Sequence, residues 1–305
     1  MKSGRGALVC LSAEPRARAR RMLVVAGGSC HDAASHPPHS TDNILSSALK
    51  FDLHKREWEE LSPMGIARIQ PGVASLGGRV YAVGGEQGSQ ILANGEVYDP
   101  QTDKWSYIAC MKEARCEFGL TAWKGNLYAF GGWVGSEMGA SVEVYDPISD
   151  EWTLIDRMPE PRFGMGVVNF EGLIYVVGGC THTWRHTRDL LCYHPASRKW
   201  RPLAPMRHAR SQAAAVVYWG RIYTFDDDSW EEVGSLVEAR AGCAAGAADG
   251  LLVAAGGDSE CGGKRDFYRA RTTLASVEIY DPTRDTWTST TSLPHSRAEA
   301  GAALL

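Results

Sequence analysis

The sequence predicts an all-β protein, a six-bladed β-propeller, and three repeated features support this. Five diglycines, at 27–28, 84–85, 131–132, 178–179 and 256–257, each follow a short apolar run, and a Tyr-Asp-Pro segment or a degenerate version of it follows most of them. One tryptophan then closes each unit, at Trp58, Trp105, Trp152, Trp200, Trp230 and Trp287. These tryptophans are 47, 47, 48, 30 and 57 residues apart. Units of about this length built from short strands are typical of propeller blades.

Each unit is predicted to hold four short strands, and the third unit shows this best. Its strands are expected at Glu117–Trp123, Leu127–Phe130, Ser141–Tyr145 and Glu151–Leu154. A diglycine ends the second strand because glycine adopts backbone angles that a Cβ disfavours. Proline follows the third strand, where it fixes φ and cannot donate to a ladder. No amphipathic helical period lasts long enough to predict a helix.

The two ends of the chain predict how the ring closes. Arg297 opens one more first strand, but no further blade follows it, and the blade that starts near Met22 lacks a first strand. We therefore expect the C-terminal strand to complete the N-terminal blade and remove two exposed sheet edges. We expect a basic linker at 1–21 and the propeller at 22–305. The blades are expected at 22–62 with 297–305, 67–111, 114–158, 161–206, 209–236 and 239–294.

Blade five departs from the pattern. Its second strand, Arg221–Phe225, runs directly into Asp226-Asp227-Asp228-Ser229-Trp230, so both the diglycine and the third strand are missing. We expect a truncated blade of two or three strands with a gap at its outer rim.

Composition narrows the class of protein. The chain has 305 residues, with 32 basic and 36 acidic side chains and a formal charge of −4. This argues against nucleic-acid binding through bulk positive charge. No run approaches the roughly 18 apolar residues that cross a bilayer, so we expect no membrane partner. Eight irregularly spaced cysteines without an export signal favour reduced thiols and a cytoplasmic location.

Diglycine, Tyr-Asp-Pro and tryptophan at these offsets resemble the repeats of kelch β-propellers, over about residues 22–305. More narrowly, the chain resembles the C-terminal propeller of the BTB–BACK–kelch family. It is similar to an actin-binding member of that family through residues 128–137 and 275–287. The resemblance implies actin binding, association with the cytoskeleton, or substrate recognition for a cullin-3 ubiquitin ligase adaptor. In that family the BTB and BACK domains recruit cullin-3, and no room for them is expected before residue 22.

Six arginines open the predicted first strands: Arg68, Arg115, Arg162, Arg210, Arg240 and Arg297. Because they occupy the same position in each repeat, they would form a ring near one mouth of the central channel of the propeller. The resemblance implies that such arginines bind acidic peptide segments, and a guanidinium can make two charge-assisted hydrogen bonds to one carboxylate. The alternative is that each arginine ties its own blade to the next loop through backbone carbonyls.

The loops between strands two and three would form the walls of this site. The residues we expect there to contact a protein partner are Trp133, His182, Trp184, Phe267, Tyr268 and Arg269. Aromatic residues interleaved with arginine are typical of interface anchors. The alternative is that these loops fold back on themselves.

Catalytic and metal-binding motifs are weak in this sequence. Cys180, His182 and His186 do not have a recognised zinc spacing, and no hydrolase, phosphate-loop or metalloprotease motif occurs. We expect a non-enzymatic protein-binding propeller without a cofactor, which reads acidic segments through its arginine and aromatic rim. Two alternatives stay open: a kelch-fold enzyme (a copper oxidase or a sugar epimerase), or an unstable isoform fragment without activity of its own.

Overall fold

The computed structural model describes residues 22–30, 43–212, 214–218, 220–225, 235–248, 250–260 and 271–305. Within these ranges the chain forms β-strands and turns and no α-helix, which confirms the all-β prediction. None of the described residues forms a helix long and apolar enough to cross a membrane. The linker predicted at 1–21 lies outside the described residues.

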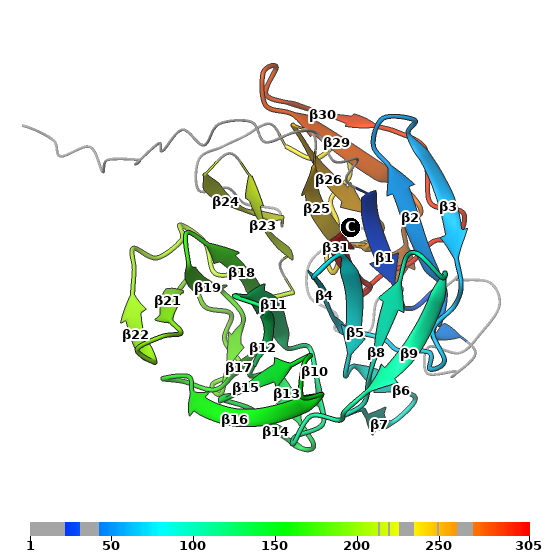
Figure 1. Ribbon diagram of the computed structural model, residues 1–305. Helices are drawn as coiled ribbons and strands as arrows, with labels where there is room; N and C mark the ends of the chain where they lie inside the picture. Colours follow the sequence, from blue (N-terminus) through cyan, green and yellow to red (C-terminus); the bar gives the residue numbers. More distant parts are fainter. Residues whose placement is uncertain are drawn as a thin grey trace, which may run out of the picture.

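The strands are arranged as sheets around a central axis (Figure 1). In the described part of the chain five sheets are four-stranded and antiparallel, and β23–β24 forms a two-stranded sheet. We number these sheets as blades one to six in chain order, and the strands of each blade from the axis outwards.

The strands at the axis are β31 (Gly301–Leu304), β4 (Gly72–Leu76), β11 (Gly119–Trp123), β18 (Gly166–Phe170), β23 (Ala214–Tyr218) and β25 (Ala244–Ala248). The second strands are β1 (Met22–Ala26), β5 (Arg79–Val83), β12 (Asn126–Phe130), β19 (Leu173–Val177), β24 (Arg221–Phe225) and β26 (Leu251–Ala255). The third strands are β2 (Ala48–Asp52), β8 (Gly95–Asp99), β15 (Ser141–Asp146), β21 (Leu190–His194) and β29 (Val277–Asp281). The outermost strands are β3 (Glu57–Leu61), β9 (Lys104–Ile108), β16 (Glu151–Arg157), β22 (Lys199–Pro202) and β30 (Thr286–Ser289).

Short strands of two or three residues lie on one face of the propeller, the face on which strand two of a blade connects to strand three. They are β6 (Glu86–Gln87), β7 (Gln90–Ile91), β10 (Arg115–Cys116), β13 (Trp133–Val134), β14 (Glu137–Met138), β17 (Arg162–Phe163), β20 (Cys180–Thr181), β27 (Asp258–Glu260) and β28 (Arg271–Thr273). Pairs such as β10–β13 and β17–β20 join the start of a blade to its own strand-two loop. We call this face the loop face. Because the strands of a blade alternate in direction, the turns between strands one and two and between three and four lie on the opposite face.

The ring closes through its two ends, as the sequence predicts. β31 pairs with β1 in antiparallel register, from Leu23 opposite Leu304 to Ala26 opposite Gly301. The axial strands contact one another in a closed cycle, in the order β31, β4, β11, β18, β23, β25 and back to β31.

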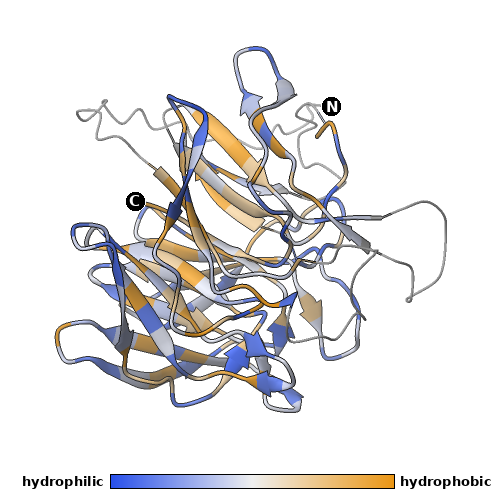
Figure 2. Ribbon diagram, turned by 90° about the vertical axis from the view of Figure 1, so that its right-hand side faces the viewer, coloured by the Kyte–Doolittle hydropathy of each residue, from blue (hydrophilic) through white to orange (hydrophobic). Residues whose placement is uncertain are grey.

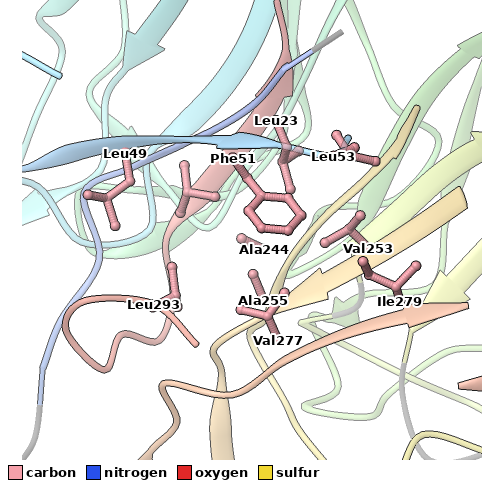
Figure 3. Close-up of a cluster of buried hydrophobic side chains, with 11 residues drawn as sticks. Leu23, Leu49, Phe51, Leu53, Ala244, Val253, Ala255, Val277, Ile279 and Leu293 are labelled. Atoms are coloured by element: carbon pink, nitrogen blue, oxygen red, sulfur yellow. The ribbon is translucent and has the colours of Figure 1, made fainter. Parts of the chain in front are cut away.

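Hydrophobic clusters fill the junctions between blades. Figure 2 shows hydrophobic residues along the strands and hydrophilic residues on many of the turns. At the closing junction, Phe51 and Leu49 of blade one pack against Val253, Ala255 and Ile279 of blade six (Figure 3). All five side chains are at most 3% exposed. Burying apolar area of this kind is the main driving force of the fold.

The repeated tyrosines and tryptophans hold the outer strands together. The Tyr145 hydroxyl donates to Asp150 Oδ1 at 2.8 Å, and the Tyr145 and Trp152 rings lie 5.2 Å apart. The Trp152 indole N–H donates to the carbonyl oxygen of Ala109 at 3.0 Å. Blade two repeats the contact, since Trp105 donates to Ser62 at 2.8 Å. Each of these indoles therefore joins its own outer strand to the segment that leads out of the preceding blade.

The diglycines let neighbouring blades approach closely. Gly131 and Gly132 both have positive φ, at 53° and 86°. A Cβ on Gly131 would lie 2.6 Å from the carbonyl oxygen of Arg162 in the next blade. The Gly132 N–H donates to that same oxygen at 2.9 Å. A side chain at Gly131 would thus disturb a contact between blades, and one at Gly132 would clash with Cys116 and Phe118 of its own blade.

Blade five is incomplete in the described residues. β23 and β24 pair along their full length, from Ala214 opposite Phe225 to Tyr218 opposite Arg221. Residues 226–234, where the sequence analysis places Trp230, lie outside the described residues.

We predict that deleting residues 297–305 destabilises the whole domain. The deletion removes β31, the inter-blade bond from the Gly257 N–H to the Arg297 carbonyl, and the buried Arg297 side chain. A thermal melt followed by circular dichroism should show a midpoint lowered by more than about 10 °C, because 1 kcal/mol shifts the midpoint by roughly 2–4 °C in chains of this size. Truncating the exposed Arg284 side chain is the control and should leave the melt unchanged. An unchanged melt after the deletion would contradict the closure mechanism.

Candidate functional site

The six arginines that open the first strands are all buried, with at most 3% of each side chain exposed. Arg115 shows the common arrangement. Its Nη1 donates to the Gly131 carbonyl at 2.9 Å, and its Nη2 lies 2.6 Å from Glu143 Oε1. Glu143 also accepts the backbone N–H groups of Lys112 and Glu113, at 2.7 and 3.1 Å. One ion pair therefore joins the start of the blade, the end of its second strand, its third strand and the preceding loop.

The other five arginines follow this arrangement with different partners. Arg68 pairs with Glu96 at 2.9 Å and Arg240 with Glu278 at 2.6 Å. Arg162 donates to the Gly178 carbonyl at 3.2 Å and lies 3.5 Å from Asp189. Arg210 donates to Thr224 Oγ1 at 3.0 Å.

Arg297 belongs to blade one, where Leu49 stands at the position of the glutamate. Its Nη2 donates to Ser47 Oγ at 3.0 Å, and burial lowers the pKa of this arginine to about 10.

These contacts correct the prediction of an exposed cationic ring that binds acidic segments. That prediction is wrong, because the six arginines are buried and bind groups inside the protein. They are Arg68, Arg115, Arg162, Arg210, Arg240 and Arg297. A buried guanidinium loses its hydration, so it is stable only where its donors find partners inside the protein. Here those partners belong to the same blade. The alternative, in which each arginine ties its own blade to the next loop through backbone carbonyls, is closer to what the structure shows: Arg115 binds a backbone carbonyl at Gly131, but also the carboxylate of Glu143 in the same blade.

The residue two positions after each arginine lies at the channel mouth on the loop face. These residues are Gln70, Glu117, Gly164, Gln212, Gly242 and Glu299, and all have φ between 50° and 63°. Together with the axial strands they line a cavity of about 210 Å³. Backbone hydrogen bonds run between blades at this level, from Gln70 N–H to Glu299 and from Gly164 N–H to Glu117, at 2.9 and 2.8 Å. We call this set of six the mouth ring.

Two glutamates give the mouth ring its electrostatic character. Burial, and next the charge of Glu299, raise the pKa of Glu117 to about 7, while hydrogen bonds from Gln212 and Gln70 lower it. Oε2 of Glu117 is buried and has no hydrogen-bond partner in the described residues. Gln70 Nε2 donates to Glu299 Oε1 at 2.9 Å. The axis of the loop face is thus polar and acidic, the reverse of what the arginine pattern predicts.

An aromatic patch lies beside the mouth ring, at the boundary of blades three and four. It consists of Trp133, Phe163 and Trp184. The Trp133 ring centroid lies 5.1 Å from that of Phe163 and 5.5 Å from that of Trp184. Trp184 is 67% exposed and the other two are half-buried. Phe163 directly precedes Gly164 of the mouth ring, so the patch and the channel mouth are neighbours.

A tight loop after β20 presents Trp184. The Trp184 N–H donates to the Thr181 carbonyl at 2.8 Å, and the Thr181 N–H donates to the Arg185 carbonyl at 3.1 Å. Trp184 has a φ of 57°, which is uncommon for a residue with a bulky side chain. Arg185 and Arg188 of the same loop are exposed. The loop therefore holds a large exposed aromatic ring and two exposed arginines, one and four residues further along the chain.

The structure separates the predicted wall residues into three groups. It brings Trp133 and Trp184 into contact, and it places His182 at the surface with Nδ1 2.9 Å from Glu160 Oε1. Phe267, Tyr268 and Arg269 lie outside the described residues. Phe163 and the mouth ring were not predicted from the sequence. Phe163 lies one residue after a repeated arginine and each residue of the mouth ring lies two residues after one, so these fixed offsets could have revealed them.

Metal ligands do not gather in the described part of the chain. No three His, Cys, Asp or Glu side chains among the described residues could hold a metal ion together. Cys180 is buried in β20, while His182 and His186 are exposed.

We predict that Glu143→Ala lowers the free energy of unfolding by about 3–5 kcal/mol, because it removes the fully buried carboxylate of Arg115 and leaves only the partly exposed Glu113, at 3.2 Å. Arg79→Ala is the control: it breaks an exposed pair with Asp99, and such pairs contribute about 0.2–1 kcal/mol. Urea denaturation of the two variants measures both effects. Equal losses would contradict the structural role of the buried pair.

The raised pKa of Glu117 also predicts a pH dependence of stability. The folded protein holds this proton up to about pH 7, whereas the unfolded chain releases it near 4.5. The free energy of unfolding should therefore fall as the pH rises from about 4.5 to about 7, by at most about 3 kcal/mol at 1.36 kcal/mol per pKa unit. Denaturation at pH 5 and pH 8 measures the fall, which Glu117→Gln should reduce. Glu151→Gln, on an exposed side chain, should leave it intact.

Comparison with known proteins identifies the family. The family model for the KLHDC2/KLHL20/DRC7 Kelch-repeats domain matches residues 16–226, and the Kelch motif matches residues 239–294. The solved structure of YjhT is similar in fold, with a TM-score of 0.66 and 15% sequence identity. The match covers 88% of this chain and 97% of that chain. Kelch repeats in a closed ring of antiparallel blades, matched over more than half of the sequence, show that the chain belongs to the kelch-repeat β-propeller family of the KLHDC2/KLHL20/DRC7 type.

Proposed function

We propose that this propeller binds a protein partner on its loop face and that the aromatic patch anchors the contact. Kelch repeats generally form protein-interaction modules. The observation that carries the proposal is the 67% exposure of Trp184, whose ring lies tilted to that of Trp133 at 5.5 Å and edge-on to that of Phe163 at 6.2 Å. Exposed tryptophans are costly in water, and tryptophan is among the residues that contribute most to binding energy at interfaces. Loops on a rigid scaffold are also the usual place for such sites.

We propose further that the partner segment is acidic and carries an apolar or aromatic residue. The acidic preference comes from Arg185 and Arg188 beside Trp184, because the six arginines of the first strands are buried. Exposed ion pairs contribute about 0.2–1 kcal/mol each, so the aromatic patch would supply most of the affinity and the two cations the selectivity. Glu299, and Glu117 once it is ionised above about pH 7, would repel an acidic segment from the channel, which favours binding across the rim.

Actin is the partner that the resemblance to an actin-binding kelch protein suggests, and binding it would place the chain in the cytoplasm at the cytoskeleton. If the propeller is joined to BTB–BACK sequence in a longer chain, we propose that the same face selects substrates for a cullin-3 ubiquitin ligase. Without that sequence it would bind the same partners without recruiting the ligase.

We predict that Trp184→Ala weakens partner binding at least 10-fold, because truncation of a central aromatic anchor typically costs about 2 kcal/mol or more. Cosedimentation with filamentous actin and affinity capture from cytosol measure the loss. The melting midpoint should stay unchanged, since most of this side chain is in solvent.

The matched control is Ile148→Ala, which truncates a 95% exposed apolar residue on the opposite face. It should bind as the wild type does. Arg185→Glu with Arg188→Glu should weaken binding at low salt more than at high salt, because salt screens exposed charges. Full binding by Trp184→Ala, or equal losses for Trp184→Ala and Ile148→Ala, would remove the aromatic patch as the site.

A further inference from the structure

We propose that blade one holds a binding site for a carboxylate, formed by Nη2 of Arg297 and Oγ of Ser47 on the loop face. The carboxylate comes from a partner protein or a small ligand and takes the position that a glutamate of the chain itself takes in two other blades. The site lies in blade one, away from the aromatic patch of blades three and four, and it does not depend on the function proposed above.

Blade three shows what stands at this position when the chain supplies the acid. Nη2 of Arg115 donates to Ser141 Oγ at 2.9 Å and lies 3.2 Å from Oε2 of Glu113. The Ser141 hydroxyl donates to the same carboxylate oxygen. Blade six repeats the group, with Oε2 of Glu238 3.8 Å from Nη2 of Arg240 and the serine hydroxyl of that blade donating to it. In both blades an arginine and a serine thus hold one carboxylate between them.

Blade one has the same two donors with different neighbours. Nη2 of Arg297 donates to Ser47 Oγ at 3.0 Å. The residue two positions before the arginine is glutamate in blades three and six, but His295 in blade one, and Leu49 stands at the position of the buried inner glutamate. Within the described ranges Arg297 therefore has no carboxylate at ion-pair distance, whereas the arginines of blades two, three, four and six each have at least one.

The charge of Arg297 is poorly compensated as a result. Its side chain is 1% exposed, and Nη1 reaches two carbonyl oxygens of its own blade at 3.3 and 3.5 Å. The same contacts of Arg115 are shorter, at 2.9 and 3.3 Å. Burial lowers the pKa of Arg297 to about 10, although the charges of Cys30 and Glu60 raise it. A buried guanidinium in this situation gains from a charge-assisted hydrogen bond to a carboxylate.

The position is reachable from the surface and suits an acceptor. The side chains of Glu113 and Glu238 are 35% and 43% exposed, so the carboxylate position in their blades opens to solvent. Ser47 is half-buried at the corresponding place in blade one. Its Oγ accepts from Arg297, which leaves its own proton to donate, as Ser141 donates to Glu113. One guanidinium N–H and one hydroxyl then face the same group, and an ionised carboxylate only accepts hydrogen bonds.

A glutamate at position 295 tests the site without removing a buried residue. His295→Glu rebuilds on the chain the carboxylate that blades three and six carry two residues before their arginine. We expect the melting midpoint, followed by circular dichroism, to rise by about 2 °C or more. His295→Gln is the matched control: it removes the exposed imidazole without adding a charge and should leave the midpoint unchanged.

The ligand is tested on the full chain with acetate as the probe. Melts in sodium acetate and in sodium chloride at equal ionic strength separate binding from screening. Acetate should raise the midpoint of the wild type and of His295→Gln in a saturable manner, because a ligand that binds only the folded state stabilises it. His295→Glu should not respond, since its own carboxylate takes the position.

Three further probes distinguish the sources of the carboxylate. The α-amide of N-acetylglutamate presents a side-chain carboxylate, N-acetylglycine presents a chain terminus, and inorganic phosphate is a different anion. The largest stabilisation by the first probe would indicate a glutamate of a partner, and by the second a partner's C-terminus. Equal stabilisation by these two and acetate would indicate a small free carboxylate.

Four results would overturn the proposal. They are equal midpoints in acetate and chloride, an acetate response that His295→Glu retains, a midpoint of His295→Glu that does not rise, and stabilisation by phosphate that exceeds that by every carboxylate.

Discussion

The buried arginine at the head of each axial strand is the constraint on which the rest of the propeller depends. Its guanidinium binds groups of its own blade, as Arg115 binds Gly131 and Glu143. Its carbonyl accepts the N–H of the second glycine in the preceding blade, as in Gly85 to Arg115. One residue therefore fixes the interior of a blade with its side chain and the contact between blades with its backbone. The glycine requirement follows, because a Cβ on Gly84 would lie 2.5 Å from that same carbonyl oxygen. The arginine charges therefore stabilise the scaffold that carries the loops and do not form the binding surface.

Much of this scaffold could be predicted from the sequence, because its parts repeat. The closing C-terminal strand, the diglycines and the tryptophans of blades one to three lie where the periodicity indicates; Trp58, Trp105 and Trp152 each donate to a backbone carbonyl before or after their own blade. The role of the arginines could not be predicted from their spacing along the sequence, because an exposed ring and a buried ring would have the same spacing. A useful signal was present in the glutamates: Glu96 and Glu143 each lie 28 residues after Arg68 and Arg115. A cation and a carboxylate that recur together indicate an internal pair.

The binding surface is harder to predict because it is where the repeat is broken. Trp133 and Trp184 were expected on the loop face, but their contact with Phe163 depends on how blades three and four are rotated against each other. The mouth ring shows the same effect. Six positions share one backbone conformation with φ near 55°, yet glycine, glutamine and glutamate occupy them. Glycine accepts that conformation without strain, so the glutamates at two of these positions reflect demands other than the backbone.

Blade five shows that the ring closes through its axial strands. β23 contacts β18 and β25, and two strands of its sheet lie within the described residues. Outer strands contribute area between blades, whereas the contacts that close the circle lie at the channel. Arg210 holds β24 to this inner ring through Thr224. The arginine at the head of the axial strand therefore fixes the inner half of blade five, as Arg115 does in blade three through Gly131 and Glu143.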